Sequence, residues 1–359
     1  MIGKHPLVVV VGSGGVGKTT LAASLGLASA AQGLKTLVMT FDPSLRLKDA
    51  LQVGDEARRR AAPVPQEGPG QLDASLLDAR QTFDRLIETY APDDAARQRI
   101  LGNRFYQHLS GSLAGILEYM AVERLFEVAQ EGAYDQIFLD TPPTRQALDF
   151  LEAPARILNF LKSPALPIAR REWFDAQGKL KATSGLGLFG RGIEGFLDRM
   201  IGVDFLREVS EFFLSFNPLY EGFEERAREV AKLLSSPSTR FLLVSGPGQE
   251  RIPDALFFAR KLREAGHHLD AVVVNRIHPD LGVGATEPKE GVDPQSVAAQ
   301  EDGRALLRWL GERDRLGVEE LTSLLGEYPL IKVPMLGDEP TDLASLKALG
   351  TRLAAQLPG

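Results

Sequence analysis

The residues Gly12 to Thr19 read Gly-Ser-Gly-Gly-Val-Gly-Lys-Thr and fit the pattern G-x-x-x-x-G-K-[ST]. Glycines allow such a loop to turn its N–H groups inward, and the positive end of a following helix strengthens the anion site. In this pattern Lys18 would reach the β- and γ-phosphates, and the Thr19 hydroxyl would ligate Mg²⁺. We therefore predict ATP and Mg²⁺ as cofactors. The predicted nucleotide contacts in the loop are Gly12, Ser13, Gly14, Gly15, Val16, Gly17, Lys18, Thr19 and Thr20.

Two carboxylates follow apolar runs that read as strands. Asp140 ends the run that begins at Gln136, and the carboxyl ends of strands are where open α/β sheets bind ligands. It is predicted, with Thr19, to hold the metal, whereas the alternative is an ordinary strand-ending or helix-capping Asp. Asp42 follows the run Thr36–Phe41 and is predicted, with Lys18, to be catalytic by positioning or activating the attacking water. It would also suit the N-cap of a helix that begins near Ser44.

Asn275 closes the apolar run Ala271–Val274. Its amide offers both a donor and an acceptor, which matches the edge of adenine. We therefore predict an adenine contact, and the alternative is an Asn in a strand-to-loop turn.

These residues need a scaffold, and the apolar runs predict one. Each run is nearly continuous rather than alternating, as in strands buried on both faces of a parallel sheet, and helical patterns lie between the runs. The pattern predicts a doubly wound, mostly parallel α/β fold, with one P-loop ATPase domain over residues 1–359. The predicted strands are Leu7–Val11, Thr36–Met39, Gln136–Leu139, Phe241–Val244, Ala271–Val274 and Leu330–Val333.

Two regions lack this alternation. Helical insertions are predicted at about 55–130, with helices alone from about 70, and at about 152–235, and a mobile loop at about 278–300. The second insertion is rich in Phe, and an all-helical subdomain with a groove for an apolar partner helix is one interpretation. The other interpretation is that these rings form a core. The aromatic residues concerned are Phe196, Phe205, Phe212, Phe213, Phe216 and Phe223.

Composition excludes several functions. The chain has 359 residues, 44% of them hydrophobic, and a net charge of −7, which argues against a broad nucleic-acid interface. It has no cysteine, so disulfides, a zinc-cysteine site and a cysteine nucleophile are excluded. No apolar stretch approaches the roughly 18 residues of a membrane span. We expect a cytoplasmic protein, although the mixed aromatic and basic segment Arg170–Arg191 leaves peripheral membrane contact open.

Taken together, the motifs resemble those of the deviant-Walker ATPases of the ArsA type, which include arsenite-pump ATPases and ATPases that target tail-anchored proteins. GSGGVGKTT resembles the family loop GKGGVGKTT, Thr40–Leu51 is similar to switch I, and Phe138–Leu151 is similar to switch II. Val272–Arg276 resembles the strand whose Asn reads adenine. The resemblance implies that Asp42 activates water, that Asp140 is the switch II carboxylate and that Asp49 is a second switch I acid.

The departures from the family pattern bear on assembly. The extra lysine of the family loop, which in relatives reaches across a nucleotide-bridged dimer, is Ser13 here, and Leu45 replaces the switch I His. Three outcomes stay open: a slow ATPase, a lysine-bearing paralogue that completes the site, or a replacement cation such as Arg145 or Arg46. The partner is accordingly a second copy or a paralogue.

Four functions remain in competition. The leading hypothesis is an ATPase whose nucleotide state switches the helical insertion and thereby the binding of a protein client. The alternatives are a weakly active ATP-binding subunit, a MinD/ParA-like positioning ATPase and a metabolic kinase. A membrane-targeting helix at Asp342–Leu357, which has leucines at helical spacing, would favour the positioning ATPase.

Overall fold

A computed structural model of the protein describes residues 6–41, 46–104, 106–107, 116–143, 145–163, 203–216, 219–281 and 303–357. The chain forms two units. The first joins Met1–Leu77, Glu127–Leu148 and Leu233–Gly359, and the second joins Asp78–Phe126 and Asp149–Lys232. Asp42, the segment Arg170–Arg191 and all but the first residues of the predicted mobile loop lie outside the described residues.

The first unit is built on an eight-stranded sheet with the order β3-β4-β2-β5-β1-β6-β7-β8. Neighbouring strands are parallel, except for the antiparallel pair β3 and β4. The central strand β1 is buried on both faces, and Val8 to Val11 are 0% exposed, which explains its continuous apolar run. This sheet confirms the predicted fold class. The strands are β1 (Leu7–Gly12), β2 (Lys35–Thr40), β3 (Ala62–Pro63), β4 (Gln71–Leu76), β5 (Gln136–Asp140), β6 (Thr239–Ser245), β7 (Leu269–Ile277) and β8 (Leu330–Pro334).

All six predicted strands are present, but β3 and β4 were not predicted. The prediction of helices alone from about 70 to 130 is wrong for Gln71–Leu76. Polar residues interrupt this strand, and two of them are nonetheless buried, Asp73 at 8% exposure and Ser75 at 6%. The Tyr134 hydroxyl donates a hydrogen bond of 2.8 Å to Asp73, so a specific partner offsets the cost of burying that carboxylate.

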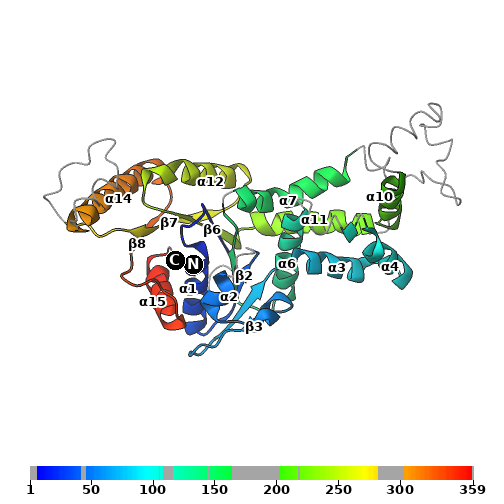
Figure 1. The fold of residues 1–359 in the computed structure, drawn as a ribbon, viewed down its shortest axis with the longest axis horizontal. Coiled ribbons are helices and arrows are strands. Elements are labelled where there is room, and N and C mark those ends of the chain that lie inside the picture. Colours follow the sequence, from blue (N-terminus) through cyan, green and yellow to red (C-terminus); the bar gives the residue numbers. More distant parts are fainter. Residues whose placement is uncertain are drawn as a thin grey trace. The chain divides into compact units, whose positions relative to one another are not determined.

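Helices cover both faces of the sheet. α1 (Lys18–Ala31) and α15 (Leu343–Gln356) lie on one face, and α12 (Ile252–Glu264) and α14 (Gly303–Leu325) lie on the other (Figure 1). The short helices α2 (Arg46–Leu51), η1 (Asp55–Arg58) and η3 (Gln249–Arg251) complete the unit.

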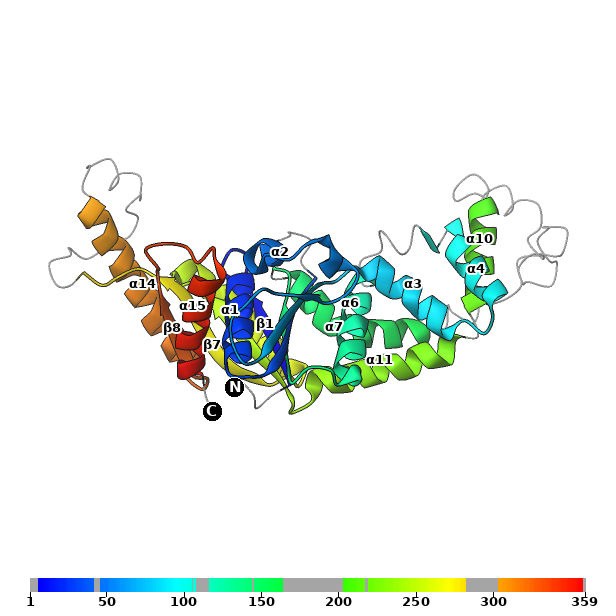
Figure 2. The same cartoon turned by 90° about the horizontal axis from the view of Figure 1, so that it is seen from below.

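The C-terminal helix α15 packs along α1 (Figure 2). Its leucines Leu346, Leu349 and Leu353 are at most 7% exposed. The two backbones approach so closely at Gly350 that a Cβ there would lie 1.8 Å from the carbonyl oxygen of Ser24. The leucine pattern of α15 is therefore part of the core, and it gives no support to a membrane-targeting helix.

Helices are the only regular secondary structure among the described residues of the second unit. The helices that contribute to it are α3 (Ala79–Tyr90), α4 (Asp94–Gly102), α6 (Ile116–Glu131), α7 (Arg145–Leu161), α10 (Val203–Phe216) and α11 (Tyr220–Ser235). Among the helices of the described ranges, none combines the length and apolarity that a membrane span requires.

Aromatic rings fill the centre of this second unit. Phe83 lies edge-on to Tyr106 with ring centroids 5.0 Å apart, and Phe216 lies 4.8 Å from Phe223. Phe212 is 3% exposed and Phe223 is 6% exposed. Phe212 and Phe223 therefore belong to the core, whereas Phe213 and Phe216 are only partly buried. Phe196 lies outside the described residues, and nothing is described of the Phe205 side chain.

A buried ion pair joins α6 to α11. Glu123 is 0% exposed, and the Arg226 guanidinium donates two hydrogen bonds to it, one of 2.7 Å from Nε. The Tyr119 hydroxyl donates to the other carboxylate oxygen over 3.1 Å. Arg226 also lies over the ring of Phe126, 4.5 Å from its centroid. These contacts give the buried carboxylate the partners it needs.

Candidate nucleotide site

The loop between β1 and α1 needs glycine at several positions. Gly12, Gly15 and Gly17 have φ values of 152°, 76° and 91°, a region that residues with a Cβ avoid. A Cβ on Gly12 would lie 2.1 Å from the carbonyl oxygen of Val244, and a Cβ on Gly17 would lie 2.5 Å from Asn275 Nδ2. Because Gly17 is also the N-cap of α1, the loop leads directly into the positive end of that helix. This backbone fits a phosphate group.

Lys18, the first residue of α1, is only 7% exposed. Its ammonium group donates a hydrogen bond of 2.9 Å to the carbonyl oxygen of Ser13 within the loop. Ser13 itself is 4% exposed. A buried ammonium group beside an anion nest can neutralise the charge of a bound phosphate.

Side chains from two other elements, α1 and β2, donate hydrogen bonds to Asp140 at the end of β5. The hydroxyls of Thr19 on α1 and Thr40 on β2 both donate to its Oδ2, over 2.7 Å and 3.1 Å. Asp140 ends β5 and is 0% exposed. Hydroxyl and carboxylate oxygens are hard donors that suit Mg²⁺, which is bound by one or two protein oxygens together with phosphates and water. Within the described ranges no group of three or more His, Cys, Asp or Glu side chains could hold a metal ion.

Asn275 lies against the loop as well. Its Nδ2 donates a hydrogen bond of 2.8 Å to the carbonyl oxygen of Val16, and its Oδ1 accepts one of 2.9 Å from the backbone N–H of Arg276. In this geometry the amide contacts the phosphate-binding loop. Its contact with adenine stays a prediction.

The structure describes the positions of the other predicted site residues only in part. Asp42 and Leu45 lie outside the described residues, and nothing is described of the Arg145 side chain beyond the start of α7. Arg46 and Asp49 are exposed on α2, the helix that follows Asp42 in the chain. The structure therefore joins Lys18, Thr19 and Asp140 in one site.

Two contacts escaped the sequence reasoning. Thr40 ends β2 and reads as an ordinary strand residue, although its hydroxyl binds Asp140. Arg276 Nη1 donates a hydrogen bond of 3.3 Å to the carbonyl oxygen of Gly15. Only its position next to Asn275 could have drawn attention to Arg276.

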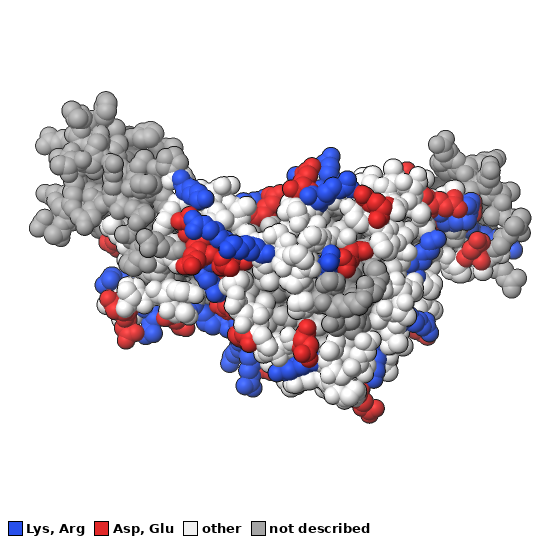
Figure 3. Space-filling view, turned by 180° about the vertical axis from the view of Figure 1, so that it is seen from behind, with Lys and Arg blue, Asp and Glu red and all other residues white. Residues whose placement is uncertain are grey.

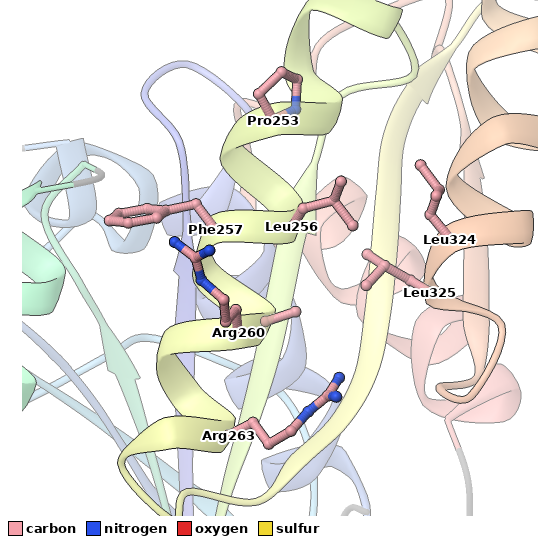
Figure 4. Close-up of a pocket in the computed structure, with 8 residues that line it drawn as sticks. Pro253, Leu256, Phe257, Arg260, Arg263, Leu324 and Leu325 are labelled. Atoms are coloured by element: carbon pink, nitrogen blue, oxygen red, sulfur yellow. The ribbon is translucent and has the colours of Figure 1, made fainter.

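A separate pocket lies in the first unit between α12 and α14 (Figure 4). Arg260 lies 5.8 Å from the ring of Phe257 and pairs with Glu264, and Arg263 pairs with Glu327. None of the lining residues is a predicted site residue. They are Pro253, Leu256, Phe257, Ala259, Arg260, Arg263, Leu324 and Leu325.

Charged residues of both signs share one face of the protein. On the face drawn in Figure 3, Lys and Arg side chains lie beside Asp and Glu side chains. Mixed charge of this kind does not form a broad basic field on that face.

A glycine loop that leads from a central parallel strand into a helix beginning Lys-Thr, with a carboxylate from the adjacent strand, defines the P-loop nucleoside triphosphatases. Comparison with known proteins narrows the class. Residues 5–168 match the model of a family described as anion-transporting ATPase. Over these residues the chain is similar to the ArsA-type ATPases, and this similarity supports binding and hydrolysis of ATP.

Curated relatives extend the similarity along the chain. An Aquifex aeolicus protein whose name describes an arsenical pump-driving ATPase is 25% identical over 98% of this chain and 79% of its own length. An ATPase ASNA1 homologue from Entamoeba histolytica is 23% identical over 97% of this chain and 94% of its own length. The ATPase GET3A from Arabidopsis thaliana is 24% identical over 95% and 81%. The predicted family is thereby confirmed.

Proposed function

We propose that the protein is a Mg²⁺-dependent ATPase switch whose nucleotide state controls the helical second unit, and that this unit binds a protein partner. One observation carries the proposal. The segment that places Asp140 in the site continues into α7, which begins at Arg145 and ends at Leu161. Since the second unit includes the chain from Asp149 onward, a change at the end of β5 acts on that unit through the backbone itself.

Each site residue has a distinct role in this proposal. Lys18 and the loop amides hold the phosphates, and Thr19 and Asp140 hold Mg²⁺, which supplies charge neutralisation at the γ-phosphate. Asp42 orients the attacking water, and Asn275 contacts adenine. Because little covalent chemistry falls to the protein in phosphoryl transfer, positioning and electrostatics account for most of the rate.

Assembly is the second part of the proposal. Ser13 offers no positive charge, so the loop lacks the cation that its relatives carry at this position. The active species is then a dimer in which Arg145 or Arg46 replaces that cation, or a heterodimer with a lysine-bearing paralogue. In the second case the protein alone binds ATP but hydrolyses it slowly. Both species would act in the cytoplasm.

The decisive experiment measures phosphate release from Mg²⁺-ATP over a wide range of protein concentrations, together with ATP binding. Lys18→Ala should lose both binding and turnover, whereas Asp42→Asn should bind ATP without turnover. Turnover that rises with protein concentration and is absent in Asp42→Asn supports the homodimer. Tight binding without turnover at any concentration contradicts the homodimer and requires the paralogue.

The switch itself is tested by amide hydrogen exchange. We expect ATP and ADP to give different protection in α7, α10 and α11 of the Asp42→Asn variant, in which the ATP state persists. Identical protection in the two states would contradict control of the second unit by the nucleotide.

A further inference from the structure

Two consecutive residues of β7 contact two consecutive carbonyls of the phosphate-binding loop. Asn275 Nδ2 donates to the Val16 oxygen over 2.8 Å, and Arg276 Nη1 donates to the Gly15 oxygen over 3.3 Å. In a regular strand neighbouring side chains point to opposite faces of the sheet, so both would not reach one loop.

An irregularity in β7 explains this exception. The register between β7 and β8 shifts between Val274 and Ile277, and Arg276 has a φ of 65°. A residue with a side chain adopts this left-handed conformation only at a cost, and bulges of this kind re-aim side chains near active sites. Here the shift directs the guanidinium towards the loop that Asn275 already contacts.

The contacted carbonyls determine where the neighbouring amides point. In a planar trans peptide the C=O and the following N–H lie on opposite sides. The Gly15 oxygen shares its peptide unit with the N–H of Val16, and the Val16 oxygen shares its unit with the N–H of Gly17. Holding both oxygens against β7 therefore turns both N–H groups to the opposite side of the loop, which is the side of an anion nest.

A third group holds the guanidinium in place. Arg276 Nη2 pairs with Glu339 Oε1 over 3.2 Å, and Glu339 lies between β8 and α15. Because Arg276 is 48% exposed and Glu339 is 75% exposed, this ion pair stabilises the fold little. Its effect is to orient the guanidinium between the Gly15 carbonyl and the Glu339 carboxylate.

We propose that Arg276 is a positioning residue for the phosphate chain of the nucleotide, because it holds the Gly15 carbonyl and thereby preorganises the N–H groups that bind phosphate. The proposal deepens ATP binding at the P-loop and rests on it. It assigns Arg276 to recognition of phosphate and not of the base. Preorganised donors bind more tightly because no reorientation is needed on binding.

The test compares Mg²⁺-ATP with Mg²⁺-tripolyphosphate, which lacks the nucleoside, by calorimetric titration of the full-length protein. Arg276→Ala should weaken the binding of both ligands by the same factor, roughly fivefold to tenfold, as expected for the loss of one ordinary, solvent-exposed hydrogen bond. The KM for ATP should rise by a similar factor with little change in kcat. Arg276→Lys, which keeps a cationic donor, should restore part of the affinity.

Three controls separate the possible causes. Glycine adopts the φ of 65° more easily than alanine, so backbone strain would make Arg276→Ala bind more weakly than Arg276→Gly. Equal losses of affinity in the two variants would therefore show that the missing side chain, and not backbone strain, causes the loss. Arg263→Ala removes the same charge in the α12–α14 pocket and should bind both ligands normally. Lys18→Ala tests the P-loop itself, so ATP binding that survives in Lys18→Ala would contradict the proposed nucleotide site rather than the role of Arg276.

Two results would overturn the assignment. One is normal affinity of Arg276→Gly for both ligands, and the other is a loss for ATP alone, which would place Arg276 at the nucleoside.

Discussion

The hydroxyl of Thr19 donates a hydrogen bond of 2.7 Å to the carboxylate of Asp140, so the first turn of α1 and the end of β5 meet at one oxygen atom. Thr40 donates to the same oxygen from β2. The acid is thus oriented by two hydroxyls while it is fully buried. These contacts fix the orientation of the carboxyl group beside the loop, so a cation that arrives with ATP would meet an oriented ligand.

Replacement of this carboxylate tests its role in metal binding. Asp140→Asn keeps the shape of the side chain but removes its charge. We expect the Mg²⁺ concentration for half-maximal turnover to rise and kcat to fall roughly 100-fold or more. Phosphate release measured across a Mg²⁺ titration checks this. The control is Asp73→Asn, a buried acid on β4 that accepts a hydrogen bond from Tyr134. Wild-type turnover in Asp140→Asn would remove Asp140 from the metal site.

Ser13→Lys restores the cation that the related loops carry. If the active species is a homodimer, the lysine should raise kcat about tenfold or more, because a cation supplied in trans stabilises the charge of the transition state. The increase should depend on protein concentration. Ser13→Met has similar length without charge and should show no such increase. A folded Ser13→Lys protein that binds ATP but gains no turnover would argue against the homodimer.

Gly350→Ala tests the contact between α15 and α1. The new Cβ would lie 1.8 Å from the Ser24 carbonyl oxygen, so the helices must separate. We expect the free energy of unfolding to fall by roughly 1–3 kcal/mol, against the usual benefit of Ala in a helix. Urea unfolding checks this. Gly102→Ala at the end of α4, where no atom lies within 4 Å, should be neutral or stabilising. Equal stability of both variants would contradict the tight contact.

We expect the free energy of unfolding to depend on pH through His267. Its Nδ1 donates a hydrogen bond of 3.1 Å to the Leu234 carbonyl, and the buried Nε2 has no partner among the described residues. Burial lowers the pKa of His267 below its ordinary value. Below about pH 6.5 the unfolded chain therefore binds a proton that the folded chain does not, and stability is lost as pH falls, by up to about 1.4 kcal/mol per unit.

The measurement is urea unfolding at several pH values from 7.5 down to about 5, the range where an unperturbed histidine titrates. His267→Gln, which keeps an N–H donor for Leu234, should be less sensitive to acid than the wild type. The same slope in both proteins would assign the acid sensitivity to other groups.

The buried ion pair of Glu123 and Arg226 should contribute to the stability of the second unit. Arg226→Met leaves Glu123 buried without its cation and should cost about 3 kcal/mol. The double variant Glu123→Leu, Arg226→Met should regain much of this, because an apolar pair of similar volume replaces the ion pair. Thermal unfolding followed by circular dichroism checks both. Wild-type stability of Arg226→Met would show that another group compensates Glu123.

The sequence predicted those parts of the site that local patterns determine. The loop Gly12–Thr19, the buried strands and the strand-ending Asp140 all have signatures within a few residues, because burial on both faces requires a continuous apolar run. The strand β4 lacks that signature, since its buried Asp73 depends on Tyr134 from a distant segment. Arg276 reaches the loop only because β7 changes register, and no pattern of residue types encodes that shift.

The contact between α1 and α15 also bears on how the protein is made. The ribosome releases α1 before the other described helices, whereas its neighbour α15 emerges only after all of them. Until then the surface of α1 that receives Leu346, Leu349 and Leu353 is uncovered, in the same helix that begins with Lys18. Until α15 has been made, the nascent chain therefore exposes an apolar surface on the helix that begins with Lys18, and chains that stop before α15 become candidates for chaperone capture or aggregation.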